Sequence, residues 1–209
     1  MIGLLPGWLD PEKLLENGGI YALAAIVFAE SGLLIGFFLP GDSLLFFAGF
    51  LSSGAGGNLL PNIVVTIVVI MVAAILGDQV GYLFGKRVGP SLFDRPKSRF
   101  FNPNHVTKAH KFFEKHGPRT IVLARFVPIV RTFAPILAGV GTMPYRTFVK
   151  YNVIGGVLWG GGVTSLGYFL GEIEFIKNNI EAAALVIVAL SVLPMAIEII
   201  RHRRARHSA

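Results

Sequence analysis

Residues 62–85 read NIVVTIVVIMVAAILGDQVGYLFG and contain Asp78 as their single charged side chain. A membrane-spanning helix needs about 20 mostly apolar residues, so this segment qualifies provided that Asp78 lies near one end. Segments 147–171 and 180–200 are long and apolar enough to span in the same way. Helices around a soluble core would show polar faces, and these segments do not. The sequence therefore predicts an all-α polytopic membrane protein.

The composition of the 209 residues excludes several other classes. Hydrophobic residues make up 53% of the chain and charged residues 15%, which excludes a disordered protein. The absence of cysteine excludes a disulfide framework, a cysteine nucleophile and a thiolate metal site. All five histidines lie at or beyond position 105, in a basic loop or the C-terminal tail, and no HExxH, P-loop or GxSxG motif occurs. We therefore expect no enzyme activity, no cofactor and no metal site.

The net charge of +7 is concentrated in two segments. Residues 86–119 hold nine Lys or Arg against two acidic residues, and residues 201–206 hold four arginines. The positive-inside rule places both segments in the cytoplasm. Between Asn102-Pro103 and Gly117-Pro118 the basic loop has the pattern of an amphipathic helix, lying on the inner leaflet or packed on the bundle. Topology thus accounts for the basic residues, and we expect no nucleic-acid partner.

Two apolar segments contain residues that interrupt helices. Segment 120–143 must enter and leave on the cytoplasmic side if 147–171 and 180–200 both span, which predicts a re-entrant hairpin. Its helix-breaking residues are Pro128, Pro135, Gly139 and Gly141. Segment 20–51 is broken at Pro40-Gly41 and is either a second re-entrant hairpin or one span plus a half-helix.

The two halves of the chain resemble each other. GYLFG at 81–85 is echoed by GYFLG at 167–171, and each follows a broken segment. If the two hairpins open to opposite sides, the chain is an inverted repeat, which is typical of secondary transporters. We expect the GxxxG pairs to be helix-packing contacts: Gly32/Gly36, Gly81/Gly85, Gly156/Gly160 and Gly167/Gly171. We divide the single domain 1–209 into an interfacial segment (1–19), first repeat (20–85), basic loop (86–119), second repeat (120–171), C-terminal span (172–200) and basic tail (201–209).

Four ionisable residues lie within the broken segments. Each costs about 2.5–3.5 kcal/mol to insert into a membrane and is a functional candidate. Glu30 and Asp42 belong to the first hairpin, and Arg125 and Arg131 to the second. Facing hairpins would bring these opposite charges together. Arginine binds phosphate bidentately, so Arg125 and Arg131 are candidates for binding a lipid phosphate.

The two carboxylates allow two readings. Glu30 and Asp42 can couple protons or act as a gate, or they can form purely structural ion pairs with the arginines. Exchanging the charges of a pair tests whether that pair is purely structural. For this test we assume that Glu30 pairs with Arg125. Asp78 is a further candidate with a supporting role. The breaking residues Pro40, Gly41, Pro128 and Pro135 are expected to shape the site.

Several motifs together resemble a known family. Glu30-Ser31-Gly32 is followed by FLPGDSLLF at 38–46, and ARFVPIVRTFAP stands at 124–135. This pattern resembles the DedA family of bacterial inner-membrane proteins, which carry the SNARE-associated (VTT) domain. The similarity extends from about residue 20 to residue 204 and is strongest toward the member that gives the family its name.

The resemblance implies two facing re-entrant hairpins flanked by spanning helices, in a bacterial inner membrane. It also implies that the acidic pair and the arginine pair are needed for function. Family members are linked to recycling of undecaprenyl phosphate and to dependence on the proton-motive force. We therefore expect proton-dependent movement of an anionic lipid, with membrane lipids and protons as partners. A proton-coupled antiporter of small solutes or ions, a phospholipid scramblase and a homo-oligomeric assembly stay open.

Overall fold

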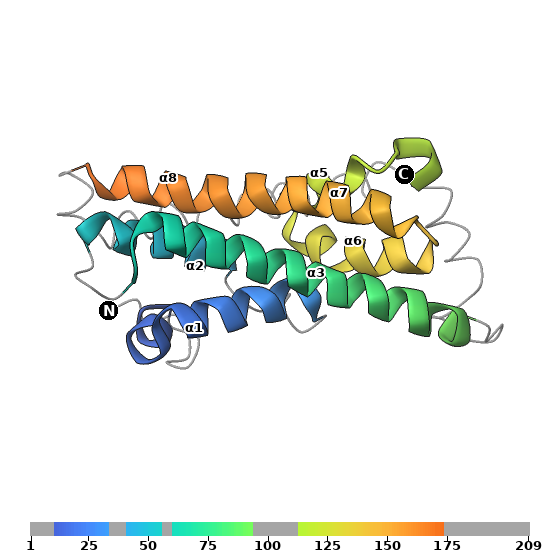
Figure 1. Cartoon of the computed structure of the whole chain (residues 1–209), viewed down its shortest axis with the longest axis horizontal. Helices are drawn as coiled ribbons and strands as arrows, with labels where there is room; N and C mark the ends of the chain where they lie inside the picture. The colour runs from blue at the N-terminus through green and yellow to red at the C-terminus, as the bar shows by residue number, and fades with distance from the viewer. Residues whose placement is uncertain (1–10, 34–40, 56–59, 94–112, 174–209) are drawn as a thin grey trace, which may run out of the picture.

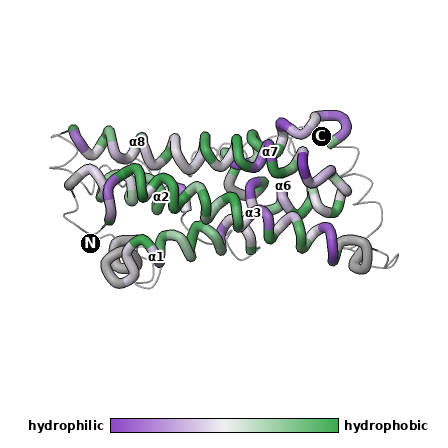
Figure 2. The backbone as a smooth tube through the Cα atoms, viewed as in Figure 1, coloured by the Kyte–Doolittle hydropathy of each residue, from purple (hydrophilic) through white to green (hydrophobic). Residues whose placement is uncertain are grey.

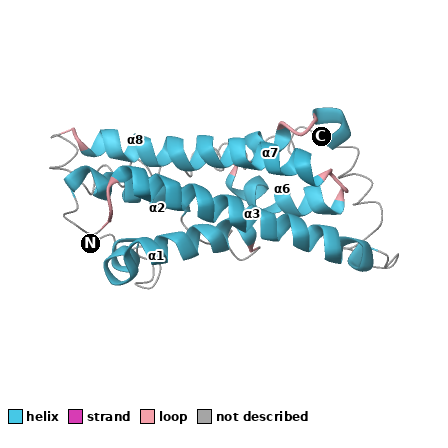
Figure 3. Cartoon of the chain, in the orientation of Figure 1, coloured by secondary structure: helices cyan, strands magenta, loops and turns pink. Residues whose placement is uncertain are grey.

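The computed structural model describes residues 11–33, 41–55, 60–93 and 113–173, and its regular structure in these ranges is helical (Figure 3). The helices are α1 (Pro11–Gly32), α2 (Gly41–Phe50), α3 (Ile63–Phe93), α5 (Thr120–Ala124), α6 (Pro128–Val140), α7 (Tyr145–Gly156) and α8 (Gly162–Gly171). Two π-helical turns follow α2 and α7, at Leu51–Ala55 (η2) and Val157–Gly161 (η3). The predicted all-α fold is confirmed for this part of the chain. The predicted span 180–200, the basic tail and most of the predicted amphipathic helix lie outside it.

Among the described residues, two helices are long and apolar enough to cross a membrane. They cover Ile63–Val88 and Tyr145–Gly171, the second being α7, η3 and α8 in continuation. These ranges match the predicted spans 62–85 and 147–171. The two helices run along the length of the bundle (Figure 1), and η3 packs against α3.

The outer face of α3 is apolar. Val64, Val68, Val72 and Leu76 recur every fourth residue, so they share one helix face, and each is 50–66% exposed. Hydrophobic residues cover most of α2 and α3 (Figure 2). A continuous apolar face of this length fits contact with lipid.

The broken segment of each half packs on the long helix of the other half. On α6, a Cβ at Gly139 would collide with the backbone of α3 at Tyr82 and Lys86. On α2, a Cβ at Gly49 would collide with the backbone of α8 at Thr164. Glycine therefore permits backbone-to-backbone contact at both crossings, α2 on α8 and α6 on α3 (Figure 1).

The GxxxG glycines are packing contacts, as predicted. Gly32 lies against the backbone of Gly77. Gly81 and Gly85 lie against α6, and Gly167 and Gly171 lie against α2 and η2. Gly156 and Gly160 lie against side chains of α3. Gly36 lies outside the described residues.

The break between α5 and α6 has a local cause. Val127 is extended (φ −117°, ψ 109°) because the residue before a proline is disfavoured in the helical region, and Pro128 then begins α6. The prediction of a break at Pro128 is therefore confirmed. The predictions for Pro135 and Gly139 are wrong, because both lie within α6. Pro135 instead leaves the carbonyl of Arg131 without its i+4 amide donor. Gly141 caps the end of α6.

Candidate functional site

Five ionisable side chains from different helices meet in the middle of the bundle and form two clusters. In the first, which we call the Arg131 cluster, Arg131 donates from Nη2 to Glu30 Oε1 and from Nη1 to Asp42 Oδ1, the latter at 2.6 Å. Glu30 stands near the end of α1, Asp42 at the start of α2 and Arg131 in the first turn of α6. Three helices are thereby connected through one guanidinium group.

The second group, the Arg125 cluster, connects α3 to α7. Arg125 Nη2 donates to Asp78 Oδ2 and to Asn152 Oδ1, the latter at 2.6 Å. Asn152 also donates from Nδ2 to the backbone carbonyl of Ile75 at 3.1 Å. Arg125 follows directly after α5, where the chain leaves helical geometry before Pro128.

Trp159 lies close to both clusters. Its Nε1–H donates to Asp42 Oδ1 at 2.8 Å. Its ring centroid lies 4.4 Å from the guanidinium carbon of Arg131 and 5.9 Å from that of Arg125. Both distances are within cation–π range. The residue sits in the π-helical turn η3, a feature often found at functional sites.

Two glycines make room for the charged side chains. A Cβ at Gly41 would collide with the carboxylate of Glu30, so only glycine lets Glu30 lie against the start of α2. A Cβ at Gly155 would lie 2.9 Å from Arg125 Cδ. These glycines bring α2 and α7 close enough to enclose the two clusters.

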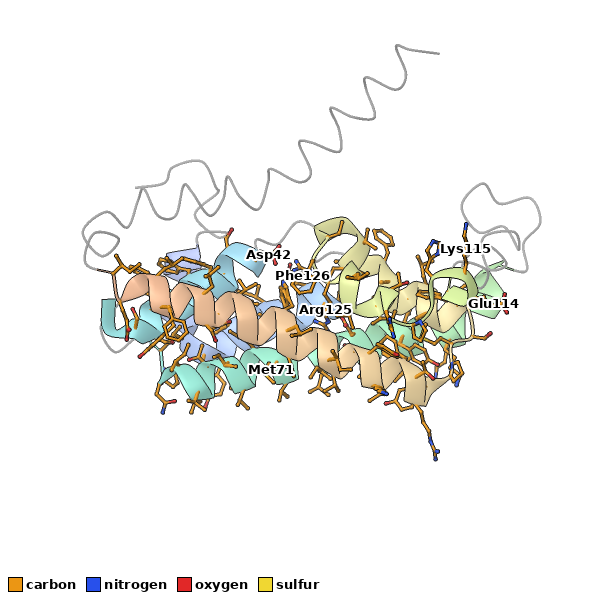
Figure 4. All side chains as sticks on the ribbon, turned by 90° about the horizontal axis from the view of Figure 1, so that it is seen from above. Asp42, Met71, Glu114, Lys115, Arg125 and Phe126 are labelled. Atoms are coloured by element: carbon orange, nitrogen blue, oxygen red, sulfur yellow. The ribbon has the colours of Figure 1, made fainter. Side chains whose placement is uncertain are left out.

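The site is buried except at one carboxylate. The side chains of Arg125, Arg131, Glu30 and Asp78 are 1–3% exposed. The Asp42 side chain is 27% exposed and is the accessible member of the Arg131 cluster. In Figure 4, Asp42, Phe126 and Arg125 lie together near the middle of the bundle, away from Glu114 and Lys115 at one end.

Part of the buried hydrogen-bonding capacity is unused. Among the described residues, the following site atoms are buried without a hydrogen-bond partner: Glu30 Oε2, Asp78 Oδ1, Arg125 Nε and Nη1, and Arg131 Nε. Buried polar atoms are normally paired, and an unpaired one costs about 1–3 kcal/mol. The site therefore has donors and acceptors free for a ligand, a proton or water.

The carboxylates outnumber the guanidinium groups. Three carboxylates face two arginines, so the fully ionised site has a formal charge of −1. One bound proton makes it neutral. Burial disfavours uncompensated charge, so this arrangement favours uptake of a proton.

The structure brings together all four charged residues that the sequence singled out. The assumed pairing of Glu30 with Arg125 is wrong, because Glu30 pairs with Arg131. Asp78 does not lie near an end of its helix either. It stands at the centre of α3 and is the ion-pair partner of Arg125. Pro40 lies outside the described residues.

Sequence reasoning missed two members of the site. Asn152 is fully buried and holds Arg125. Its signal was available, because it is a lone amide within an apolar segment. Trp159 carries no charge and was not among the candidates, but its ring centroid lies 4.4 Å and 5.9 Å from the guanidinium carbons of Arg131 and Arg125. Nothing in the sequence distinguishes it from a packing aromatic.

Comparisons with known proteins give one family match and several relatives. Residues 39–169 match the VTT domain family, a range that includes both arginines, Asp42, Asp78 and Trp159. Protein DedA of Escherichia coli strain K12 is 50% identical over 196 residues, covering 93% of this chain and 89% of that protein. An uncharacterized membrane protein of Mycobacterium leprae is 46% identical over 187 residues, covering 90% and 82%. One from Mycobacterium tuberculosis strain H37Rv is 44% identical over 211 residues, covering 98% and 92%. No solved structure matches the chain significantly.

Proposed function

The chain belongs to the DedA family of membrane proteins with a VTT domain, and from this premise we propose that it moves an anionic lipid, undecaprenyl phosphate or a similar polyprenyl phosphate, between leaflets. One observation carries the proposal. Two buried arginines, each paired with at least one carboxylate, lie near the same Trp159 ring at mid-bundle. Such arginines bind a phosphate group bidentately once a carboxylate is displaced, while the lipid chain stays in the bilayer. The role is transport rather than enzyme catalysis.

We propose that the site lies between two facing re-entrant hairpins related as an inverted repeat. The first hairpin contains α1 and α2, and the second contains α5 and α6. The reciprocal packing of α2 on α8 and of α6 on α3 supports this, since a glycine stands at each crossing, Gly49 at the first and Gly139 at the second. Broken helices meeting near the midplane are a recurrent basis for alternating access. The whole chain then forms one VTT-type domain, with the repeats at 20–85 and 120–171.

Protons are the proposed driving ion. A phosphomonoester carries about −1.5 to −2 charges near neutral pH, and the fully ionised site already carries −1. Binding the anion without added positive charge would be opposed by repulsion at low dielectric. Protonation of Glu30 and Asp42 removes that repulsion, so substrate and protons enter the site together.

The basic segments support the proposed orientation. Residues 86–119 and the C-terminal tail lie on the cytoplasmic side of a bacterial inner membrane, as the positive-inside rule predicts. A proton gradient directed inward across that membrane would then drive return of a lipid phosphate from the outer leaflet. The partners are membrane lipids and protons, in a monomer or a homo-oligomer.

The test uses purified full-length protein in vesicles of phosphatidylcholine with a fluorescent polyprenyl phosphate. An impermeant quencher reports the fraction of label in the outer leaflet over time. Wild type is expected to move the label faster under an imposed proton gradient, and Arg125→Ala and Arg131→Ala are expected to abolish this movement. Arg146→Ala is the matched control, because Arg146 is exposed and outside both clusters.

The same vesicles separate the alternatives. Equal movement of labelled phosphatidylcholine and polyprenyl phosphate, independent of the gradient, would indicate a scramblase. Solute-driven acidification of the lumen without lipid movement would indicate an antiporter. Equal rates for wild type and the arginine variants would refute the assigned mechanism.

A further inference from the structure

The two arginines are held very differently. Arg125 is bound by a buried carboxylate and a fully buried amide, and Asn152 is itself tied to the backbone of α3. Arg131 shares its two terminal nitrogens between a buried carboxylate and the partly exposed Asp42. Only the Arg131–Asp42 contact therefore has an exposed member.

Trp159 makes two contacts to that exposed pair. Its N–H binds the same Oδ1 atom of Asp42 that accepts from Arg131, at 2.8 Å and 2.6 Å. Its ring face lies against the Arg131 guanidinium at 4.4 Å. The indole thus supports both partners independently, so the guanidinium keeps its position when the carboxylate moves.

We propose that Trp159 is a positioning residue that makes Arg131 and Asp42 an exchangeable pair. A lipid phosphomonoester displaces Asp42 from Arg131 Nη1, while the ring holds the guanidinium plane and the N–H holds the displaced carboxylate nearby. Arg125 stays bound to Asp78 and Asn152 and contributes its charge at 5.9 Å from the ring centroid. This inference rests on the proposed function, because it assigns the anion to one of the two arginines.

The free Nε atom of Arg131 supports the exchange. It is buried and without a hydrogen-bond partner among the described residues. A guanidinium presents its donors in a fixed plane suited to two phosphate oxygens. Displacement of Asp42 frees Nη1 for a charge-assisted bond to the phosphate, and Nε–H, on the edge that it shares with Nη2, is a further unpaired donor of the same guanidinium.

The chain offers a direct spectroscopic test. It contains two tryptophans, Trp8 and Trp159, so Trp8→Phe leaves Trp159 as the single indole. Its emission responds to charges that move near the ring. Full-length Trp8→Phe protein in detergent is titrated with farnesyl phosphate, and with farnesol as the uncharged control. Trp159→Phe with Trp8 retained reports any signal that does not come from the site.

The expected result is a saturable change in Trp159 emission with farnesyl phosphate and none with farnesol. Asp42→Asn should tighten binding several-fold, because the competing carboxylate is gone, and the amide oxygen still accepts from the indole. Arg131→Lys retains charge but loses the planar donor pair, so it should weaken binding strongly. Arg125→Lys should weaken binding less than Arg131→Lys.

Other outcomes would overturn the inference. An equal response to farnesol would show that the site does not recognise the phosphate group. Unchanged or weaker binding in Asp42→Asn would refute competition for Arg131. Gradient-driven lipid movement in vesicles without a Trp159 response would leave the transport function standing and refute the role of Trp159. A clear Trp159 response without lipid movement would refute the transport function and retain the binding site.

Discussion

The guanidinium group of Arg131 lies over the indole ring of Trp159, with its carbon atom 4.4 Å from the ring centroid, although the two residues come from different helices. A desolvated cation–π contact of this kind is worth about 2 kcal/mol. It attaches the start of α6 to the middle of the long helix Tyr145–Gly171 and fixes Arg131 opposite Glu30 and Asp42. The charged site is thus organised around an aromatic side chain.

Exchanging the charges of Glu30 and Arg131 distinguishes an ion pair that only stabilises the fold from one that takes part in transport. We expect Glu30→Arg with Arg131→Glu to regain part of the stability lost by each single change, because an opposite-charge pair is restored. Lipid movement should stay absent, because the arginine no longer faces Trp159 and Asp42. Thermal unfolding and the vesicle assay measure the two effects. Wild-type transport by the double variant would mean that the pair only stabilises the fold.

Asp78 should matter more for stability than Asp42. Asp78→Asn removes the charged partner of a buried arginine, and breaking a buried pair costs about 3–5 kcal/mol. Asp42→Asn affects a partly exposed pair, for which about 0–1 kcal/mol is expected. Unfolding midpoints of the purified proteins in one detergent give the comparison. Equal losses would contradict the distinction between a fixed and an exchangeable pair.

Asn152→Ala should lower both stability and transport. The substitution leaves Arg125 with one side-chain acceptor and frees a buried donor, at about 1–3 kcal/mol. Asn62→Ala is the matched control, because Asn62 accepts from the backbone N–H of Val65 near the start of α3, far from the site in sequence. Losing that cap costs about 1 kcal/mol and should spare transport. Similar transport by both variants would argue against a role for Asn152 in holding Arg125.

Glycine substitutions test the reciprocal helix crossings. Gly49→Ala and Gly139→Ala each place a Cβ against the backbone of the opposing long helix, which should cost about 1–3 kcal/mol through overpacking. Gly162→Ala meets nothing within 4 Å and should gain up to about 1 kcal/mol from helix propensity. Chemical or thermal unfolding of the three variants provides the measurement. If Gly49→Ala and Gly162→Ala had the same effect, the close crossing of α2 and α8 would be wrong.

Binding of the lipid phosphate should take up protons. The ionised site is negative, so the bound state holds more protons than the free state, and affinity falls as the pH rises. Calorimetric titration with farnesyl phosphate in buffers of different ionisation enthalpy counts these protons. Glu30→Gln should take up fewer protons than wild type. The ligand's own protonation contributes equally to both proteins, so an identical count would exclude Glu30 as a proton acceptor.

The spans and the charged candidates could be predicted from the sequence, and the pairing could not. An apolar run such as Ile63–Val88 predicts a spanning helix from its length and composition. Charged residues such as Glu30 and Arg131 stand out because insertion disfavours them. Which of these charged residues pair depends on where along their lengths two helices cross, and helix packing determines that position.

Two further features show where local sequence rules fail. Pro128 and Pro135 carry the same local signal, but only Pro128 begins a helix, because the packed surroundings hold α6 together across Pro135. Trp159 looks like any aromatic residue in an apolar segment. Its importance follows from the two guanidinium groups close to its ring, which only the three-dimensional arrangement reveals.

The separation of Glu30 from Arg131 along the chain has a consequence for biogenesis. The partners are 101 residues apart, so at about 5–20 residues per second the ribosome needs about 5–20 seconds to make the second after the first. During that delay α1 and α2 hold carboxylates without counter-charges. Neutral, protonated acids enter a bilayer more readily than charged ones. We therefore expect the nascent first half to stay beside the insertion machinery until the arginines arrive.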